Sequence, residues 1–375
     1  MRRRDFLFGT SAIAVSTALA GCQSSAALTV EVLQNSVPPQ LLRQFSRNLT
    51  RGMALNFIPQ PQLKNLFELL QKWQQTRQNQ VDESPQTQAD LVMIGDYWLT
   101  RAIQQQLIQP LQPQSLQNWD LLPQKWQNLV KRNDKGQLDA NGSVWAAPYR
   151  WGTTVLIYRK DKFKALGWTP EDWHDLWRDQ LRDRISLLNQ PREVIGLTLK
   201  KLGQSYNTTN LSSVEDLSSQ LQQLHQNVKL YDSNTYLKPL IIGDTWLAMG
   251  WSTDIPKSLQ RQYKLGVVVP ASGTALWTDL WVKPASRSQP PEADIADRWI
   301  DFCWQPEIAQ QLSLLTEATS PIVAGLTPQQ RLPEWNNQPV LLPNISILDN
   351  SEFLLPLPED TLEQYRQLWQ QIRLL

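Results

Sequence analysis

Cysteine and histidine are scarce in this chain of 375 residues, which contains two of each. Zinc sites draw on sets of Cys and His ligands, and His174 and His225 lie far apart in polar helical surroundings. We therefore expect both histidines on solvated helix faces, with no bound metal or other cofactor. Cys303 stands in the helical pattern RWIDFCW and is expected to be a buried core thiol.

Local signatures of catalysis are also missing. The sequence has no G-x-S-x-G turn, no phosphate-binding glycine loop, no H-E-x-x-H and no C-x-x-C. Carboxylates that come together only in space leave an exported hydrolase open, and a structural lipoprotein scaffold is a third class. The absence of every local motif favours a binding protein over an enzyme.

Neither sign of charge is in excess, because 36 basic side chains face 35 acidic ones. Loss of residues 1–21 would remove three arginines and one aspartate, which leaves 33 basic and 34 acidic side chains. Nucleic-acid binding requires a basic patch or stripe. We therefore expect no nucleic-acid partner.

An apolar run over residues 6–20 follows three consecutive arginines at the N-terminus. Such a positive start, short hydrophobic region and small residues before a cut site indicate an export signal. The run is too short for a bilayer span of about 20 residues, and Arg3–Leu7 fits the twin-arginine pattern R-R-x-F-L. The ending Leu-Ala-Gly-Cys resembles the bacterial lipobox, so we predict removal of residues 1–21 and lipidation of Cys22. The mature protein is then expected in the periplasm, tethered to the membrane by lipid.

The rest of the chain alternates between strand and helix patterns, typical of α/β structure. Apolar residues are expected to form strands at 28–33, 54–58, 89–94, 155–158, 184–188, 247–251 and 265–269. Helical spacing predicts helices at 39–45, 63–73, 98–106, 192–202, 214–226, 296–315 and 362–372. The Gln-rich stretch 74–88 is expected to be a loop or frayed helix end. Because the alternation restarts near residue 152, we predict two α/β lobes rather than one long sheet.

Several segments, in the right order, resemble the spermidine/putrescine-binding proteins of ABC transporters, which are extracellular solute-binding proteins of family 1. The resemblance covers essentially the whole mature chain. These segments are VPPQLLRQF (37–45), ADLVMIGDY (89–97), APYRWGTT (147–154), WHDLW (173–177), REVIGLTLKKLG (192–203) with NTT (207–209), and LWTDLWVKP (276–284).

The resemblance implies a type II periplasmic-binding clamp with a ligand in the cleft between two lobes. Each lobe would be a central mixed β-sheet flanked by helices. Lobe 1 is expected to comprise residues 28–151 and 278–322, and lobe 2 residues 152–277 and 323–375. The implied partners are a polyamine-like small molecule and an ABC transporter permease, and we expect the protein to be a monomer.

The resemblance also assigns ligand-binding roles. Tyr97 matches a family tyrosine that faces the ligand chain, while Trp251 and Trp277 match aromatic walls around its methylene groups. Asp279 and Glu193 match carboxylates that pair with amines. Asp279 has support of its own, because it stands in an otherwise apolar strand, where an acid requires a partner.

The sequence does not decide which acid would bind the second amine of a polyamine. Gln190 stands where the family carries an acid, and Asp96 or Glu352 would restore a negative charge. Glu193 also fits a purely structural role in the first turn of a helix, where a carboxylate interacts favourably with the helix dipole. The same clamp could therefore hold a different small polar solute, such as an amino acid derivative or an anion.

Overall fold

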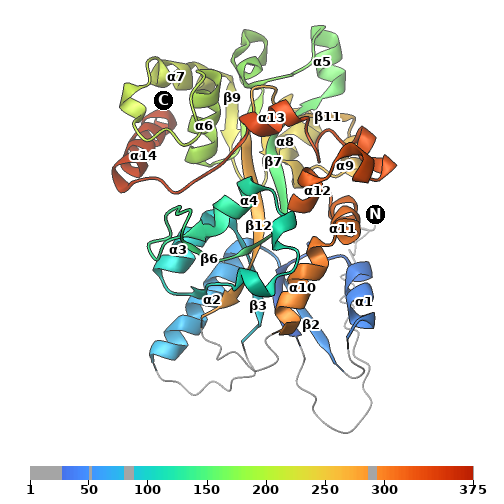
Figure 1. Ribbon diagram of the computed structural model, residues 1–375. Coiled ribbons are helices and arrows are strands. Elements are labelled where there is room, and N and C mark those ends of the chain that lie inside the picture. Colours follow the sequence, from blue (N-terminus) through green and yellow to red (C-terminus); the bar gives the residue numbers. More distant parts are fainter. Residues whose placement is uncertain (1–27, 50–52, 80–87, 286–293, 375) are drawn as a thin grey trace, which may run out of the picture.

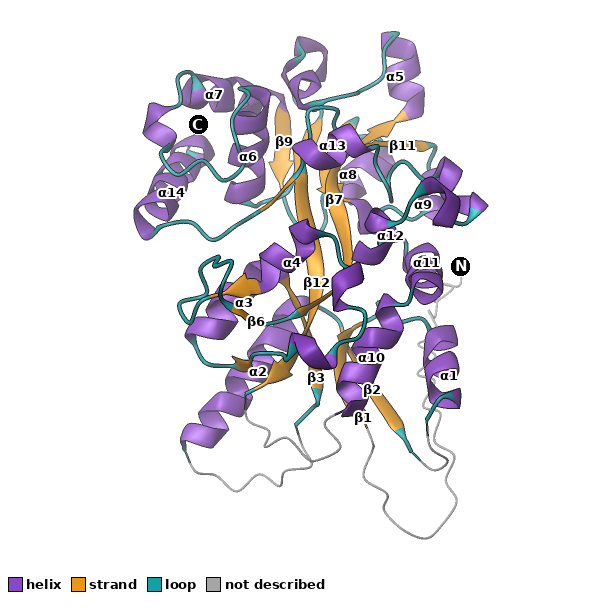
Figure 2. Ribbon diagram, in the orientation of Figure 1, coloured by secondary structure: helices purple, strands orange, loops and turns teal. Residues whose placement is uncertain are grey.

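The computed structural model describes residues 28–49, 53–79, 88–285 and 294–374. The molecule is elongated and has two halves, with long central strands running from one half into the other (Figure 1). Helices lie on both sides of the strands in each half (Figure 2). The predicted export signal and Cys22 lie outside the described residues. Within the described ranges, no helix is long and apolar enough to cross a membrane.

The N-terminal part alternates between strand and helix, as predicted. Its elements are β1 (Leu28–Leu33), α1 (Pro39–Arg47), β2 (Leu55–Gln60), α2 (Leu63–Gln78), β3 (Leu91–Gly95) and α3 (Asp96–Gln104). β1 pairs in parallel with both β2 and β3. The apolar face of α2 is buried through Leu66, Phe67, Leu70 and Trp73, as its helical spacing predicts. α2 continues to Gln78, so the Gln-rich stretch starts as the end of this helix.

Shorter elements follow before the central strand β7. They are β4 (Ile108–Gln109), η2 (Pro113–Ser115), η3 (Trp119–Leu121), α4 (Gln124–Val130), β5 (Lys131–Arg132) and β6 (Ser143–Val144). β7 itself spans Ala147–Arg159, far more than the predicted strand at 155–158. The prediction was too short because the polar and small residues of Tyr149–Thr154 interrupt the apolar pattern, although all are buried in the structure.

The second half repeats the alternation. Its elements are α5 (Lys160–Leu166), η4 (Trp173–Trp177), η5 (Asp179–Leu181), β8 (Ile185–Leu187), α6 (Pro191–Lys201), η6 (Leu211–Ser213), α7 (Leu217–Asn227), β9 (Val228–Tyr231), α8 (Leu237–Ile242), β10 (Leu247–Trp251), η7 (Ser252–Asp254), α9 (Lys257–Gln262) and β11 (Leu265–Val268). The predicted strands at 247–251 and 265–269 and helices at 192–202 and 214–226 are confirmed, with small shifts at their ends.

Two strands join the halves. β12 (Ala275–Pro284) pairs with β3 and with β7, and β7 pairs in turn with β10 and β11. The main strand order is therefore β2-β1-β3-β12-β7-β10-β8-β9, in one hydrogen-bonded path. The α/β fold with helices flanking the strands is confirmed. The prediction that the lobes would not share one long sheet is wrong, because β7 and β12 pair and make the sheet continuous between the halves.

The chain ends in a series of helices, with one short strand before the last. They are α10 (Asp294–Trp304), α11 (Pro306–Thr316), α12 (Pro321–Gly325), η8 (Pro328–Gln330), η9 (Pro333–Asn337), α13 (Ile345–Asn350), β13 (Glu352–Phe353) and α14 (Glu359–Arg373). The prediction of one helix over 296–315 is wrong. Gln305 is extended and Pro306 opens a new helix, because proline cannot donate a helical hydrogen bond but suits a first helical position.

Two buried apolar clusters form the cores of the halves. The first gathers side chains of 28–151 with β12 and α10–α11, and the second gathers side chains of 155–275 with α14. The segment between α12 and α14 contacts both, since Trp335 packs in the first cluster and Ile347 against the second. The lobe boundary at residues 322 and 323 therefore stays a prediction.

Many of the large aromatic side chains are buried in these two cores. Trp126, Trp151, Trp173, Trp281, Trp299 and Trp304 are among the largest fully buried side chains. Cys303 is buried, as predicted. His174 is exposed, but His225 is half-buried and hydrogen-bonds the Tyr231 hydroxyl at 3.1 Å, so only His174 fits the predicted solvated position. No group of metal-ligating side chains was found within the described part of the chain.

Candidate functional site

Strand pairing places several predicted site residues in one row on one face of the sheet. Asp279 lies opposite Arg150, and Trp277 lies opposite Gly152. Two residues farther along β7, Thr154 lies opposite Trp251 of β10. Since side chains alternate between faces along a strand, residues 150, 152 and 154 share a face with their partners. We call this set the central row, and it follows the two strands that join the halves (Figure 1).

Gly152, in the middle of the central row, leaves the space that the Trp277 side chain occupies. A Cβ atom at this position would lie 2.3 Å from Cζ2 of Trp277 and 2.5 Å from Oγ of Ser252. The Trp277 indole therefore lies against the bare backbone of β7. Both Trp277 and Trp251 stay partly accessible, so their rings form the apolar part of the row that can still meet a ligand.

Asp279 forms a buried ion pair. Its carboxylate accepts a hydrogen bond from Nε of Arg150 at 2.7 Å, and the two residues are only 2% and 6% exposed. Burial raises the pKa of Asp279, while the Arg150 charge and its hydrogen bond act to lower it. The expectation that this acid requires a partner is met within the chain. Arg150 is not among the site residues predicted from the sequence, although it stands inside a segment that carries the family resemblance.

Asp96 lies beside Asp279 at the junction of β3 and α3. It is the first residue of α3 and 8% exposed, and it accepts a hydrogen bond from the Thr278 backbone N–H at 3.2 Å. Burial raises the pKa of Asp96 to about 7, although the Thr278 N–H and the Arg132 charge act to lower it. Tyr97 follows and is 57% exposed. Burial of its hydroxyl nevertheless raises the pKa of Tyr97 to about 12.

Glu193 reaches the central row from the other half. It lies in the first turn of α6, is 6% exposed, and both its carboxylate oxygens accept from the Thr154 hydroxyl at 3.0 Å. Burial raises the pKa of Glu193 to about 7, with interactions from Thr154 and Trp251 acting to lower it. The carboxylate is thus bonded across to β7. Gln190, at the exposed helix cap, makes no capping bond with its side chain.

Glu352 has a structural role. Its carboxylate accepts hydrogen bonds from the Ser205 hydroxyl, from the Tyr206 N–H at 3.1 Å and from Lys200 Nζ at 3.1 Å. Burial would raise the pKa of Glu352, but these three donors outweigh it and hold the pKa below its usual value. The Glu352 charge is therefore compensated by the segment that ends α6, and this residue adds no free charge to the central row.

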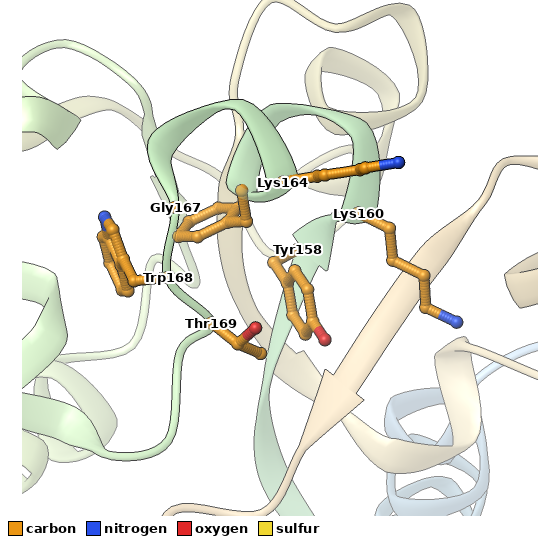
Figure 3. A pocket seen from close by; sticks show the side chains of 7 residues that line it. Tyr158, Lys160, Lys164, Gly167, Trp168 and Thr169 are labelled. Atoms are coloured by element: carbon orange, nitrogen blue, oxygen red, sulfur yellow. The ribbon is translucent and has the colours of Figure 1, made fainter.

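Two surface hollows lie elsewhere and lack acids. One, of about 290 Å³, is lined by Tyr158, Lys160, Phe163, Lys164, Gly167, Trp168 and Thr169. In Figure 3 both lysine side chains extend away from Trp168. The other, of about 560 Å³, lies beside η9 and α13 and is lined by Arg331, Trp335 and neighbouring apolar and amide side chains. Neither set of lining residues contains a carboxylate, so neither suits an amine.

The buried ion pair predicts a coupled effect on stability. Asp279→Asn should lower the free energy of unfolding by about 3–5 kcal/mol, because Arg150 would remain buried without its counter-charge. Adding Arg150→Met should recover most of that loss, as measured by urea denaturation of the four proteins in the cycle. Asp161→Asn breaks an exposed pair with Arg159 and serves as a control, with an effect of about 1 kcal/mol or less. A stable Asp279→Asn protein would contradict the coupling.

The raised pKa of Glu193 predicts a pH-dependent difference between the wild type and Glu193→Gln. Because the pKa of Glu193 is about 7 in the fold against an ordinary 4.5, stability that depends on its neutral form is lost as the pH rises through 7. Glutamine cannot ionise, so the variant should gain up to about 3 kcal/mol over the wild type as the pH rises from about 4.5 to about 7, and the difference should stay constant at higher pH. The ionisation of Asp96 affects the stability of both proteins equally, so it cancels from the difference between them. Denaturation at a series of pH values checks this, and a pH-independent difference would refute it.

Comparison with known proteins places this geometry in a family. Residues 86–350 match the bacterial extracellular solute-binding proteins. The spermidine/putrescine-binding periplasmic protein of Escherichia coli (strain K12) is 25% identical over 317 residues, 84% of this chain and 83% of that protein. A putrescine/cadaverine-binding protein of Pseudomonas aeruginosa is 26% identical over 252 residues, 64% of this chain and 70% of that protein.

A solved structure has the same fold. The spermidine/putrescine ABC transporter substrate-binding protein PotD from Streptococcus pneumoniae has a TM-score of 0.76 at 20% sequence identity. The match covers 92% of this chain and 98% of that one. The two-lobed fold inferred from the sequence is therefore confirmed, and with it the resemblance. This chain belongs to the bacterial extracellular solute-binding proteins.

Proposed function

We propose that this protein captures an aliphatic amine and delivers it to the permease of an ABC importer. Polyamines belong to this ligand class and appear in the names of the relatives. The proposed cleft lies along the central row, between the half that contains Asp279 and the half that contains Glu193. The observation that carries the proposal is this single row, in which two partly accessible indole rings stand between buried carboxylates.

The chemistry of the central row suits an amine with a methylene chain. The rings of Trp251 and Trp277 offer faces against which methylene groups can pack, and an ammonium over such a face gains roughly 0.5–2 kcal/mol. Glu193 accepts hydrogen bonds from neutral groups only. Its buried carboxylate therefore lacks a direct cationic partner, and an ammonium ion would supply one.

A thermal-shift panel tests the ligand class. Putrescine, spermidine, aliphatic amino acids, sugars and metal salts are added to the purified protein, and an amine at about 100 times its Kd should stabilise the fold by about 2.7 kcal/mol. Glu193→Gln should abolish most of that gain. Glu171→Gln removes an equal charge from an exposed position and should leave the gain intact. Stabilisation only by sugars or metals would contradict the proposal.

We also propose that the mature protein is a periplasmic lipoprotein. The support is the sequence around Cys22, which the structure does not describe. Cys22→Ala should move the protein from the membrane fraction to the soluble fraction, because the lipid chains that hold it would be lost. Replacing Arg3 and Arg4 by lysine should slow export if the twin-arginine route is used. A Cys22→Ala protein that remains in the membrane fraction would refute the anchor.

A further inference from the structure

The two ends of the central row differ in how their acids are paired. At the α6 end stands Glu193, and the charge of the neighbouring Arg192 acts on it, although the Arg192 guanidinium donates its hydrogen bonds to the carbonyl of Leu355 and to Asn207. At the β3 end, Asp279 and Asp96 stand against two arginines. Arg150 pairs with Asp279, and the Arg132 charge acts on Asp96. Glu193 and Asp96 therefore accept hydrogen bonds only from neutral groups, whereas Asp279 has a cation bonded to it. With two arginines facing its two acids, the β3 end carries no net negative charge.

Arg150 also has unused hydrogen-bonding capacity. Its Nε binds Asp279, but within the described residues neither terminal amino group of the guanidinium makes a hydrogen bond. Neither of these nitrogens is among the buried polar atoms that lack a partner, so both remain reachable from solvent. A guanidinium with its outer edge free is matched by a carboxylate, which can accept two parallel hydrogen bonds.

The free edge of Arg150 does not suit an α,ω-diamine, because it would face the second ammonium group of that ligand. We propose that the ligand is an aliphatic ω-amino acid, with its ammonium group at Glu193 and its carboxylate on the free edge of Arg150. The methylene chain between them would lie on Trp277 and Trp251. This inference rests on the proposed function and narrows its ligand. Arg150 and Thr154, which holds Glu193, are four residues apart on β7, about 13 Å, and the side chains at each end shorten that span.

Calorimetry with matched ligands tests the assignment. The pairs are 4-aminobutanoate with putrescine, and 6-aminohexanoate with 1,6-diaminohexane, so that each pair differs in one terminal group. The wild type should bind at least one ω-amino acid tenfold or more tightly than its matched diamine. Tighter binding of both diamines would overturn the inference.

Substitution of Arg150 separates two roles of this residue. Arg150→Lys keeps the positive charge beside Asp279 but loses the two guanidinium amino groups that would bind the ligand carboxylate. The substitution should therefore weaken ω-amino acid binding tenfold or more without weakening diamine binding. Arg150→Met should abolish the amino acid preference, and Arg150→Lys provides the test if the methionine variant does not fold. If Arg150 only occupies an ammonium site at Asp279, Arg150→Met would tighten diamine binding and leave the amino acid unaffected, which overturns the inference.

Glu193→Gln distinguishes failure of this inference from failure of the proposed function. This variant should weaken both members of each pair, because both place an ammonium group at the same end. If Glu193→Gln weakens binding while Arg150→Lys leaves the ω-amino acid affinity unchanged, the ammonium site at Glu193 is supported and the carboxylate site at Arg150 is refuted. If no amine and no amino acid binds the wild type, the proposed function fails together with the inference.

Discussion

The antiparallel pairing of β7 with β12 is the interaction on which the rest of this structure depends. Both strands take part in the ladders of the two halves, so their register decides which residues from distant parts of the chain meet. That register sets Asp279 opposite Arg150 and Trp277 opposite Gly152. Any side chain at Gly152 would collide with the Trp277 ring. A one-residue slip would turn the row to the other face of the sheet.

The acids of the central row have different hydrogen-bond partners. Asp279 has a cation at hydrogen-bond distance, whereas Glu193 has only neutral donors within that distance. A buried carboxylate without a counter-ion favours its neutral form, which explains why the pKa of Glu193 reaches about 7. An arriving ammonium ion would favour the ionised form. Binding of an amine at Glu193 should thus be coupled to release of a proton near neutral pH.

The fold and the ligand of this protein rest on different observations. The fold follows from a family match over residues 86–350 and a structural likeness to a substrate-binding protein. The ligand depends on a few charged side chains that the fold does not dictate. Arg150 offsets the charge of Asp279 in the proposed cleft while the β7–β12 ladder continues on both sides of the pair.

The alternation of strands and helices was predictable because it depends on local periodicity, and it identified most elements within a few residues. The sequence also supplied Asp279, Glu193 and the two tryptophans of the central row, through an apolar strand with one acid and through family resemblance. The helix break at Pro306 was not predicted, because the apolar helical pattern continues on both sides of it. The length of β7 was not predicted, because polar residues in its first half interrupt the apolar pattern although they are buried. Only the tertiary structure decided that Arg150 pairs with Asp279 and that Lys200, near the end of α6, binds Glu352. The first pair is separated by 129 positions in the sequence and the second by 152. Contacts over such separations depend on strand register and packing, which local sequence patterns do not reveal.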